Sequence, residues 1–155
     1  MSITLNLARR FREPLINGKW VANTNLKEQL SDITYKQATI STHGLNSMAA
    51  LTFHIDYYIQ GVLQVFEGGT LDIRDKYSFD MPDIQSEADW SELRNNLWLH
   101  TEQFAKALES MPDEKLNEVF VEEKYGDYRR NIEGLIEHAY YHLGQLVLIK
   151  KLLNA

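Results

Sequence analysis

Two histidines four residues apart, close to the C-terminus, are the residues whose type and spacing most directly suggest chemistry. His138 and His142 lie in the segment EHAYYHLGQL, which otherwise reads as part of a buried helix. Residues four apart lie one above the other on the same face of a helix, so both imidazoles can reach a single point in space. A divalent cation at that point would bind one nitrogen of each ring, while the other nitrogen donates to a nearby acceptor. The spacing therefore indicates a candidate metal site.

The setting of this pair strengthens a spacing that is weak evidence by itself. Chance readily produces one such pair among five histidines. The apolar stripe of the predicted final helix consists of Ile132, Leu135, Ile136, Ala139, Leu143, Leu146 and Leu153. At about 100° per residue, both histidines lie at the inner edge of this stripe and face the interior of a bundle. Burying two neutral imidazoles costs free energy unless their nitrogens find partners, and a metal ion is one such partner.

A third ligand is needed, and two histidines on other helices qualify. His54 flanks the apolar stripe of its predicted helix, and His100 lies between Leu97 and Phe104 on an equally inward face. Periodicity does not choose between them, and a hydrogen-bonded histidine at the core boundary is the simpler interpretation of His100. Three histidines leave the fourth position of a tetrahedral zinc open, as in catalytic sites. His43, in a Thr-His-Gly turn, is expected to serve the turn or a helix cap.

Other polar residues near these histidines are candidates to line a pocket. Tyr58 follows His54 by one turn, and Gln145 lies in the turn after the HxxxH pair. Ordinary helix packing explains each of them equally well. Glu137 is rotated by about 100° from its histidine neighbour and is predicted to lie at an exposed helix edge. The sequence therefore names no catalytic acid or base.

The elements that must position these side chains are helices, because the apolar periodicity is helical and strand signals are weak. A first helix is predicted at 2–16, and Asn25 followed by Glu28 resembles the capping box of a short helix. Three long helices are expected after it. The first begins at a cap at Asn46 or Ser47 and ends at Gly68-Gly69, and the second runs from near Asp89 to Met111-Pro112. The third is capped by Asp127 and runs from Tyr128 to about Leu153, and a short helix is expected before it, in 113–123. Helices with apolar stripes and no strands predict an all-α bundle.

The connection between the second and third long helices is unusually long. About twenty residues separate Gly68 from Asp89, whereas antiparallel neighbours in a bundle are joined by roughly two to eight. We therefore expect a four-helix bundle with a long crossover and with its second and third helices parallel. Four crossover residues are candidates to cover a pocket mouth, although a surface loop packed on its own aromatic rings is the simpler interpretation: Lys76, Tyr77, Phe79 and Asp80.

The composition excludes several classes of protein. The chain has 155 residues, 44% hydrophobic and 25% charged, which is typical of one globular domain covering residues 1–155. It has no cysteine, so disulfides and thiolate ligands are excluded. The net charge of −6 argues against a nucleic-acid partner, and a solvated helix face explains the basic cluster at Arg9, Arg10 and Arg12. We expect a cytoplasmic protein without a membrane partner, because neither a signal peptide nor a bilayer-spanning segment is recognisable.

The order of these motifs resembles the DinB-like superfamily of metal-dependent four-helix-bundle enzymes. The resemblance covers about residues 26–150 and rests on a helix with one histidine, MAALTFHIDYYIQGVLQVFEGG, a long crossover, and EHAYYHLGQL. It implies parallel second and third helices, a homodimer, and a divalent metal held by His54, His138 and His142. It also sets His100 aside, because the third helix of this family does not ordinarily supply a ligand. The N-terminal segment NGKWVANTNLKEQL is less typical of the family.

Two functions are consistent with these residues. The first is a metal-dependent enzyme acting on a small-molecule substrate, with the hydrolase-like or thiol S-transferase chemistry that the resemblance implies. Zinc or nickel is the expected ion, and iron or manganese would also accept three imidazoles. The second is a non-catalytic helical protein that binds a ligand or a partner, in which any metal only stabilises the bundle.

Overall fold

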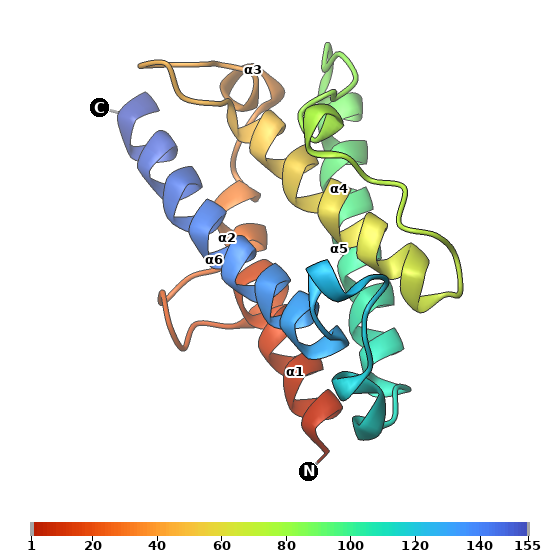
Figure 1. Ribbon diagram of the computed structural model, residues 1–155. Coiled ribbons are helices and arrows are strands. Elements are labelled where there is room, and N and C mark those ends of the chain that lie inside the picture. The colour runs from red at the N-terminus through yellow and green to blue at the C-terminus, as the bar shows by residue number, and fades with distance from the viewer. Residues whose placement is uncertain (1, 155) are drawn as a thin grey trace.

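The computed structural model describes residues 2–154, and its regular elements are helices (Figure 1). They are α1 (Ile3–Arg12), α2 (Leu26–Leu30), α3 (Tyr35–Ala38), α4 (Met48–Phe66), α5 (Glu87–Glu109) and α6 (Tyr128–Leu153). A π-helical turn, Glu13–Asn17, continues α1, and 3₁₀ turns form at Asp75–Tyr77, Asp113–Asn117 and Glu123–Tyr125. Residues 2–154 contain no strand, so the all-α prediction is confirmed. Among these helices none combines the length and the apolar composition needed to cross a membrane.

The long helices begin where a side chain can cap the first turn. The side chains of Ser47, Ser86 and Asp127 each accept a hydrogen bond from the backbone N–H three residues on. Each cap satisfies one of the N–H groups that a helix N-terminus leaves without an internal partner. Ser47 and not Asn46 therefore caps α4, and α5 begins at Glu87, slightly before the predicted start, because Ser86 supplies its cap.

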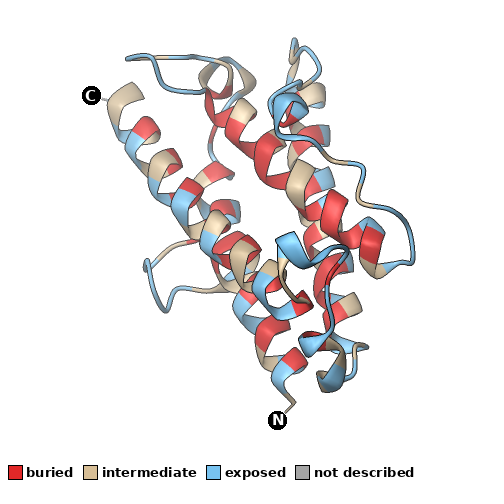
Figure 2. Cartoon of the chain, in the orientation of Figure 1, coloured by how far each residue is buried: buried red, intermediate tan, exposed pale blue. Residues whose placement is uncertain are grey.

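Four long helices share one core. Helix α5 packs against α1 and α4, and α6 packs against the same two helices from the other side. Figure 2 shows that the buried residues of each helix face the other helices and that the exposed ones face outward. Four of the core residues are fully buried, each with 0% exposure: Phe11, Leu97, Phe104 and Leu146. Burial of one such side chain stabilises a fold by roughly 1.5–3 kcal/mol, so this core keeps the four helices in place.

Helices α4 and α5 run in the same direction. Asp56 contacts His100 near the middle of the two helices, and the ring of Phe66 lies 4.9 Å from that of Phe104 nearer their C-terminal ends. A later residue of α4 thus contacts a later residue of α5, as expected for parallel helices. The colours of Figure 1, which follow residue number, run in the same direction along both helices. The 68–86 connection must therefore return to the starting end of α4.

The returning crossover lies directly along α4. The side chain of Gln64 donates to Asp72 at 2.7 Å, and the hydroxyl of Tyr57 accepts from the backbone N–H of Arg74 at 2.8 Å. At Gly61 the approach is so close that an added Cβ would lie 2.4 Å from the side chain of Ile73. The crossover is therefore fixed in register against α4, and this register decides which of its residues reach His54.

A hydrogen-bonded histidine–carboxylate pair between α4 and α5 generates a prediction about pH. Asp56 is 3% exposed and accepts a hydrogen bond from Nδ1 of His100 at 2.8 Å. The hydrogen bond to Asp56 raises the pKa of His100, against the opposing effect of burial. A raised folded-state pKa adds stability that is fully present below the usual value of about 6.5 and is lost as pH rises through the folded-state pKa.

We therefore expect His100→Asn to lower the free energy of unfolding more at about pH 5.5 than at about pH 8.5. Urea denaturation at the two pH values measures this difference. The control is His43→Asn, which changes an exposed turn residue with φ of 51° that asparagine tolerates. An equal cost of His100→Asn at both pH values would contradict the prediction.

Candidate metal centre

Three of the five histidines converge between α4 and α6. Nε2 of His138 lies 3.1 Å from Nε2 of His54 and 2.9 Å from Nε2 of His142. One nitrogen from each ring lies within 4.8 Å of the other two. His54 and His142 are buried and His138 is half-buried. The structure thus brings together the three histidines that the sequence and the resemblance named.

Hydrogen bonds behind two of the rings point their free nitrogens at a common place. Nδ1 of His54 donates to the carbonyl oxygen of Ser78 at 3.2 Å, and Nδ1 of His142 donates to Oε1 of Gln145 at 2.7 Å. A neutral imidazole protonated at Nδ1 carries a lone pair on Nε2. Both lone pairs therefore face Nε2 of His138, which can offer a proton to only one of them. A cation would accept lone pairs from all three rings, so this donor set fits a divalent metal.

The environment of the cluster keeps its imidazoles neutral. Burial, together with the neighbouring His142 and His54, lowers the pKa of His138 to about 4. Burial also lowers the pKa of His54 and of His142, against the opposing effect of the hydrogen bonds that they donate to Ser78 and Gln145. Only neutral imidazole binds a metal, so the rings need lose no proton at neutral pH before they coordinate an ion.

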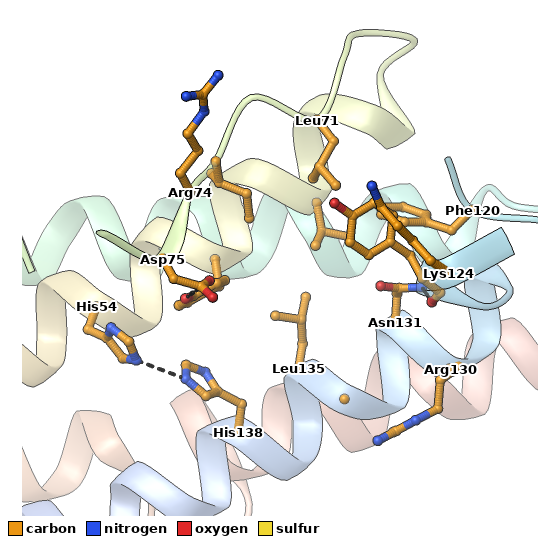
Figure 3. A pocket seen from close by; sticks show the side chains of 15 residues that line it. His54, Leu71, Arg74, Asp75, Phe120, Lys124, Arg130, Asn131, Leu135 and His138 are labelled. Atoms are coloured by element: carbon orange, nitrogen blue, oxygen red, sulfur yellow. Dashed lines mark hydrogen bonds between the residues drawn. The ribbon is translucent and has the colours of Figure 1, made fainter. Parts of the chain in front are cut away.

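A cavity of about 740 Å³ opens beside the cluster (Figure 3). His54 and His138 line one end of it, and residues of α4, the crossover, the segment before α6 and the start of α6 line the rest. Its volume lies in the range of sites that hold small molecules, roughly 300–1,000 Å³. A metal on the three histidines would therefore be reached from a space large enough for a substrate.

The crossover contacts the site through Phe79, which its sequence had suggested, and through Ser78 and Asp75, which it had not. The ring of Phe79 stacks on His54, with centroids 4.1 Å apart and planes 9° from parallel. The Ser78 carbonyl binds the same histidine, and Asp75 accepts a hydrogen bond from the Tyr58 hydroxyl at 2.7 Å. Ser78 and Asp75 were missed because loop residues carry no periodicity that would place them. Of the four crossover candidates, Phe79 contacts the site, whereas Lys76 packs over the ring of Tyr77.

The two pocket candidates have different positions. Tyr58 lines the cavity, and its ring packs edge-on to His54 at 5.1 Å and to His138 at 5.2 Å. Gln145 lies outside the cavity lining and contacts the site through His142. Tyr58 can therefore touch a molecule in the cavity, whereas Gln145 orients a histidine.

The remaining candidates lie away from the cluster. His100 binds Asp56, which confirms the hydrogen-bonded interpretation, and His43 occupies the turn before α4, where its Nδ1 contacts the Thr42 hydroxyl. Glu137 forms an exposed ion pair with Arg130, as its rotation from the histidines predicted. None of these three joins the group of nitrogens described above.

The fold and the site together define a helical bundle with a three-histidine centre of the kind that binds a divalent metal. A family model described as the DinB superfamily matches residues 19–146, which include all three histidines and the crossover. The chain belongs to the DinB superfamily, and the resemblance is confirmed. Comparison with the curated proteins and with the solved structures found no match.

The hydrogen bond behind His142 generates a prediction. Acceptors that orient a ligating histidine typically contribute 10–100-fold to metal affinity. We expect Gln145→Ala to weaken zinc binding about tenfold, measured by competition with a chelating dye. Gln103→Ala, at an exposed position of α5, is the matched control and should change nothing. Equal affinity of the Gln145→Ala variant and the unaltered protein would show that this hydrogen bond does not support the site.

Proposed function

We propose that this protein is a divalent-metal-dependent enzyme that acts on a small molecule. His54, His138 and His142 hold the ion and leave a coordination position open toward the cavity. One observation carries the proposal: three neutral imidazole nitrogens converge at the end of a cavity of about 740 Å³. Family membership supports it, because the matched residues contain the whole cluster.

Zinc or nickel is the ion we propose, since three imidazoles suit both, and iron or manganese would also accept them. When bound, such an ion lowers the pKa of a coordinated water or thiol and polarises a substrate oxygen. Hydrolysis and thiol S-transfer are the reactions that this chemistry favours. The remaining steps depend on groups of the chain that face the cavity.

Asp75 is the group best placed to accept a proton. It lines the cavity, yet its carboxylate does not belong to the group of ligand atoms that lie within 4.8 Å of one another. The hydroxyl of Tyr58 donates to Oδ1 of Asp75, and burial raises the pKa of Tyr58, so this hydroxyl keeps its proton. Oδ2 remains available to accept a proton from a molecule in the cavity. Tyr58 thus orients Asp75 without competing for that proton.

The composition of the cluster favours an open site over a purely structural one. Structural zinc sites are almost always closed by four protein ligands, whereas catalytic sites keep three and an open position. Among residues 2–154 the group contains three histidines and no fourth ligand. The cavity beside it gives the open position access to a substrate.

Zinc binding tests the first part of the proposal. With free zinc at about 100 times its Kd, binding should stabilise the fold by about 2.7 kcal/mol. We expect this stabilisation in thermal melts of the unaltered protein, and we expect His54→Ala, His138→Ala and His142→Ala each to abolish it. His43→Asn is the control and should retain it. If neither zinc nor nickel changes the melting temperature of the unaltered protein, the result counts against the proposal.

Replacement of Asp75 tests the proposed proton transfer. General base catalysis typically contributes 10²–10⁴-fold, so Asp75→Asn should slow the hydrolysis of p-nitrophenyl acetate by the zinc-loaded protein at least about 100-fold. Zinc affinity should not change, because Asp75 is not a ligand, and Asp80→Asn in the same crossover is the matched control. A loss of zinc affinity in Asp75→Asn would instead identify a ligand. Inactivity of the zinc-loaded protein toward this ester and toward a thiol with an electrophilic acceptor would favour the non-catalytic alternative.

A further inference from the structure

The cavity has a charge opposite to that of the chain. The whole sequence has a net charge of −6. The charged residues that line the cavity are Arg74, Lys124, Arg130 and Asp75, three basic and one acidic, which gives a local charge of +2. A divalent ion on the histidines would add to this positive charge. A concave surface lined by one sign of charge concentrates ligands of the other sign, so the lining favours an anion.

Two of the three basic residues lie at the end of the cavity opposite the histidines, whereas Arg74 lies beside Asp75. Figure 3 shows His54 and His138 at one end and Lys124 and Arg130 at the other. On α6, Arg130 and His138 are eight residues apart, which separates their Cα atoms by roughly 12 Å along the helix and about 80° around it. The Arg130 guanidinium extends along the helix to Glu137. The cavity therefore accommodates an elongated molecule that reaches both ends.

The middle of the cavity is apolar and open. The apolar residues of the lining are Val62, Leu71, Ile73, Phe120 and Leu135, and Figure 3 shows Leu135 between His138 and the Lys124 end. Gly134 lies midway between Arg130 and His138 on the same face of α6, and an added Cβ would meet only the Arg130 guanidinium, at 3.7 Å. Because glycine has no side chain, only the guanidinium of Arg130, on its way to Glu137, lies over this position. An apolar chain or ring can occupy this middle section.

The present partners of the two cations can be displaced. Lys124 pairs with Glu122 at 3.1 Å, with both side chains about 60% exposed. Arg130 pairs with Glu137 at 3.0 Å, with side-chain exposures of 61% and 65%. Exposed ion pairs contribute little stability, so an anion within the cavity can compete for either cation.

We infer that the cavity binds an elongated, anionic small molecule. Its carboxylate or phosphate group lies at Lys124 and Arg130, its apolar middle lies over Gly134 and Leu135, and its reacting group reaches the histidines. The placement of the reacting group rests on the proposed function. The preference for an anion rests on the cavity alone and holds with or without a metal.

Titration of the ¹⁵N-labelled full-length protein with octanoate and with octanol tests this inference. In the metal-free protein we expect octanoate to shift the amide resonances of residues 124–135 and to bind about tenfold more tightly than octanol at low ionic strength. This advantage should shrink as salt is added, because the two cations are exposed and salt screens them. Equal binding of the two compounds would overturn the inference.

Two variants identify the cations responsible. The double variant Lys124→Gln with Arg130→Gln should remove the preference for octanoate, and Lys106→Gln, at an exposed position of α5, should retain it. Both target side chains are exposed, so thermal melting should change little and will confirm that the variants fold. A preference for octanoate that persists in the double variant would overturn the inference.

The same titrations on the zinc-loaded protein separate this inference from the proposed function. Failure to bind zinc overturns the proposed function but leaves the metal-free titration valid. A protein that binds zinc yet does not distinguish octanoate from octanol in its metal-free form overturns only the present inference. If octanoate shifts only the resonances around His54 and His138 in both forms, the anionic group lies at the wrong end and the inference fails.

Discussion

Three imidazoles, two buried and one half-buried, meet so that the lone pairs of His54 and His142 both face Nε2 of His138. Such an arrangement is unfavourable until a cation accepts those lone pairs. Helix α6 supplies two of the rings from successive turns, and α4 supplies the third across the core. The Ser78 carbonyl and the Gln145 amide hold two rings in the tautomer that exposes Nε2. The bundle thus maintains a geometry that isolated helices would not adopt.

The parallel arrangement of α4 and α5 has a direct consequence for the site. Parallel neighbours require a connection that travels the length of a helix, and here it returns along α4. Because the connection returns along α4, Asp75, Ser78 and Phe79 lie on the side of α4 that carries His54. A short turn between α4 and α5 could not place these groups there. The topology of the bundle and the contacts around the candidate metal centre therefore have the same origin.

Net charge and local charge support different conclusions about partners. A net charge of −6 argues against an extended nucleic-acid surface, which needs many basic residues on one face. It does not predict the sign of a cavity, because a few side chains decide the local field. The end of the cavity opposite the histidines carries Lys124 and Arg130, so the acidic chain presents a basic cavity. An anionic small molecule is compatible with both observations.

Sequence alone was enough to predict the long helices, most of their caps and the HxxxH pair, because hydrogen bonds and side-chain contacts within a few residues govern those features. It did not predict α3, and the short helix expected in 113–123 is a 3₁₀ turn at Asp113–Asn117. It could not choose by periodicity between His54 and His100, since both lie on inward faces; the resemblance to the DinB-like family made that choice. The tertiary structure supplied the reason: packing of α4 against α5 directs His100 to Asp56, and packing of α4 against α6 directs His54 to His138. The roles of Asp75 and Ser78 were decided there as well, because irregular backbone has no repeat that predicts where its side chains and carbonyls point.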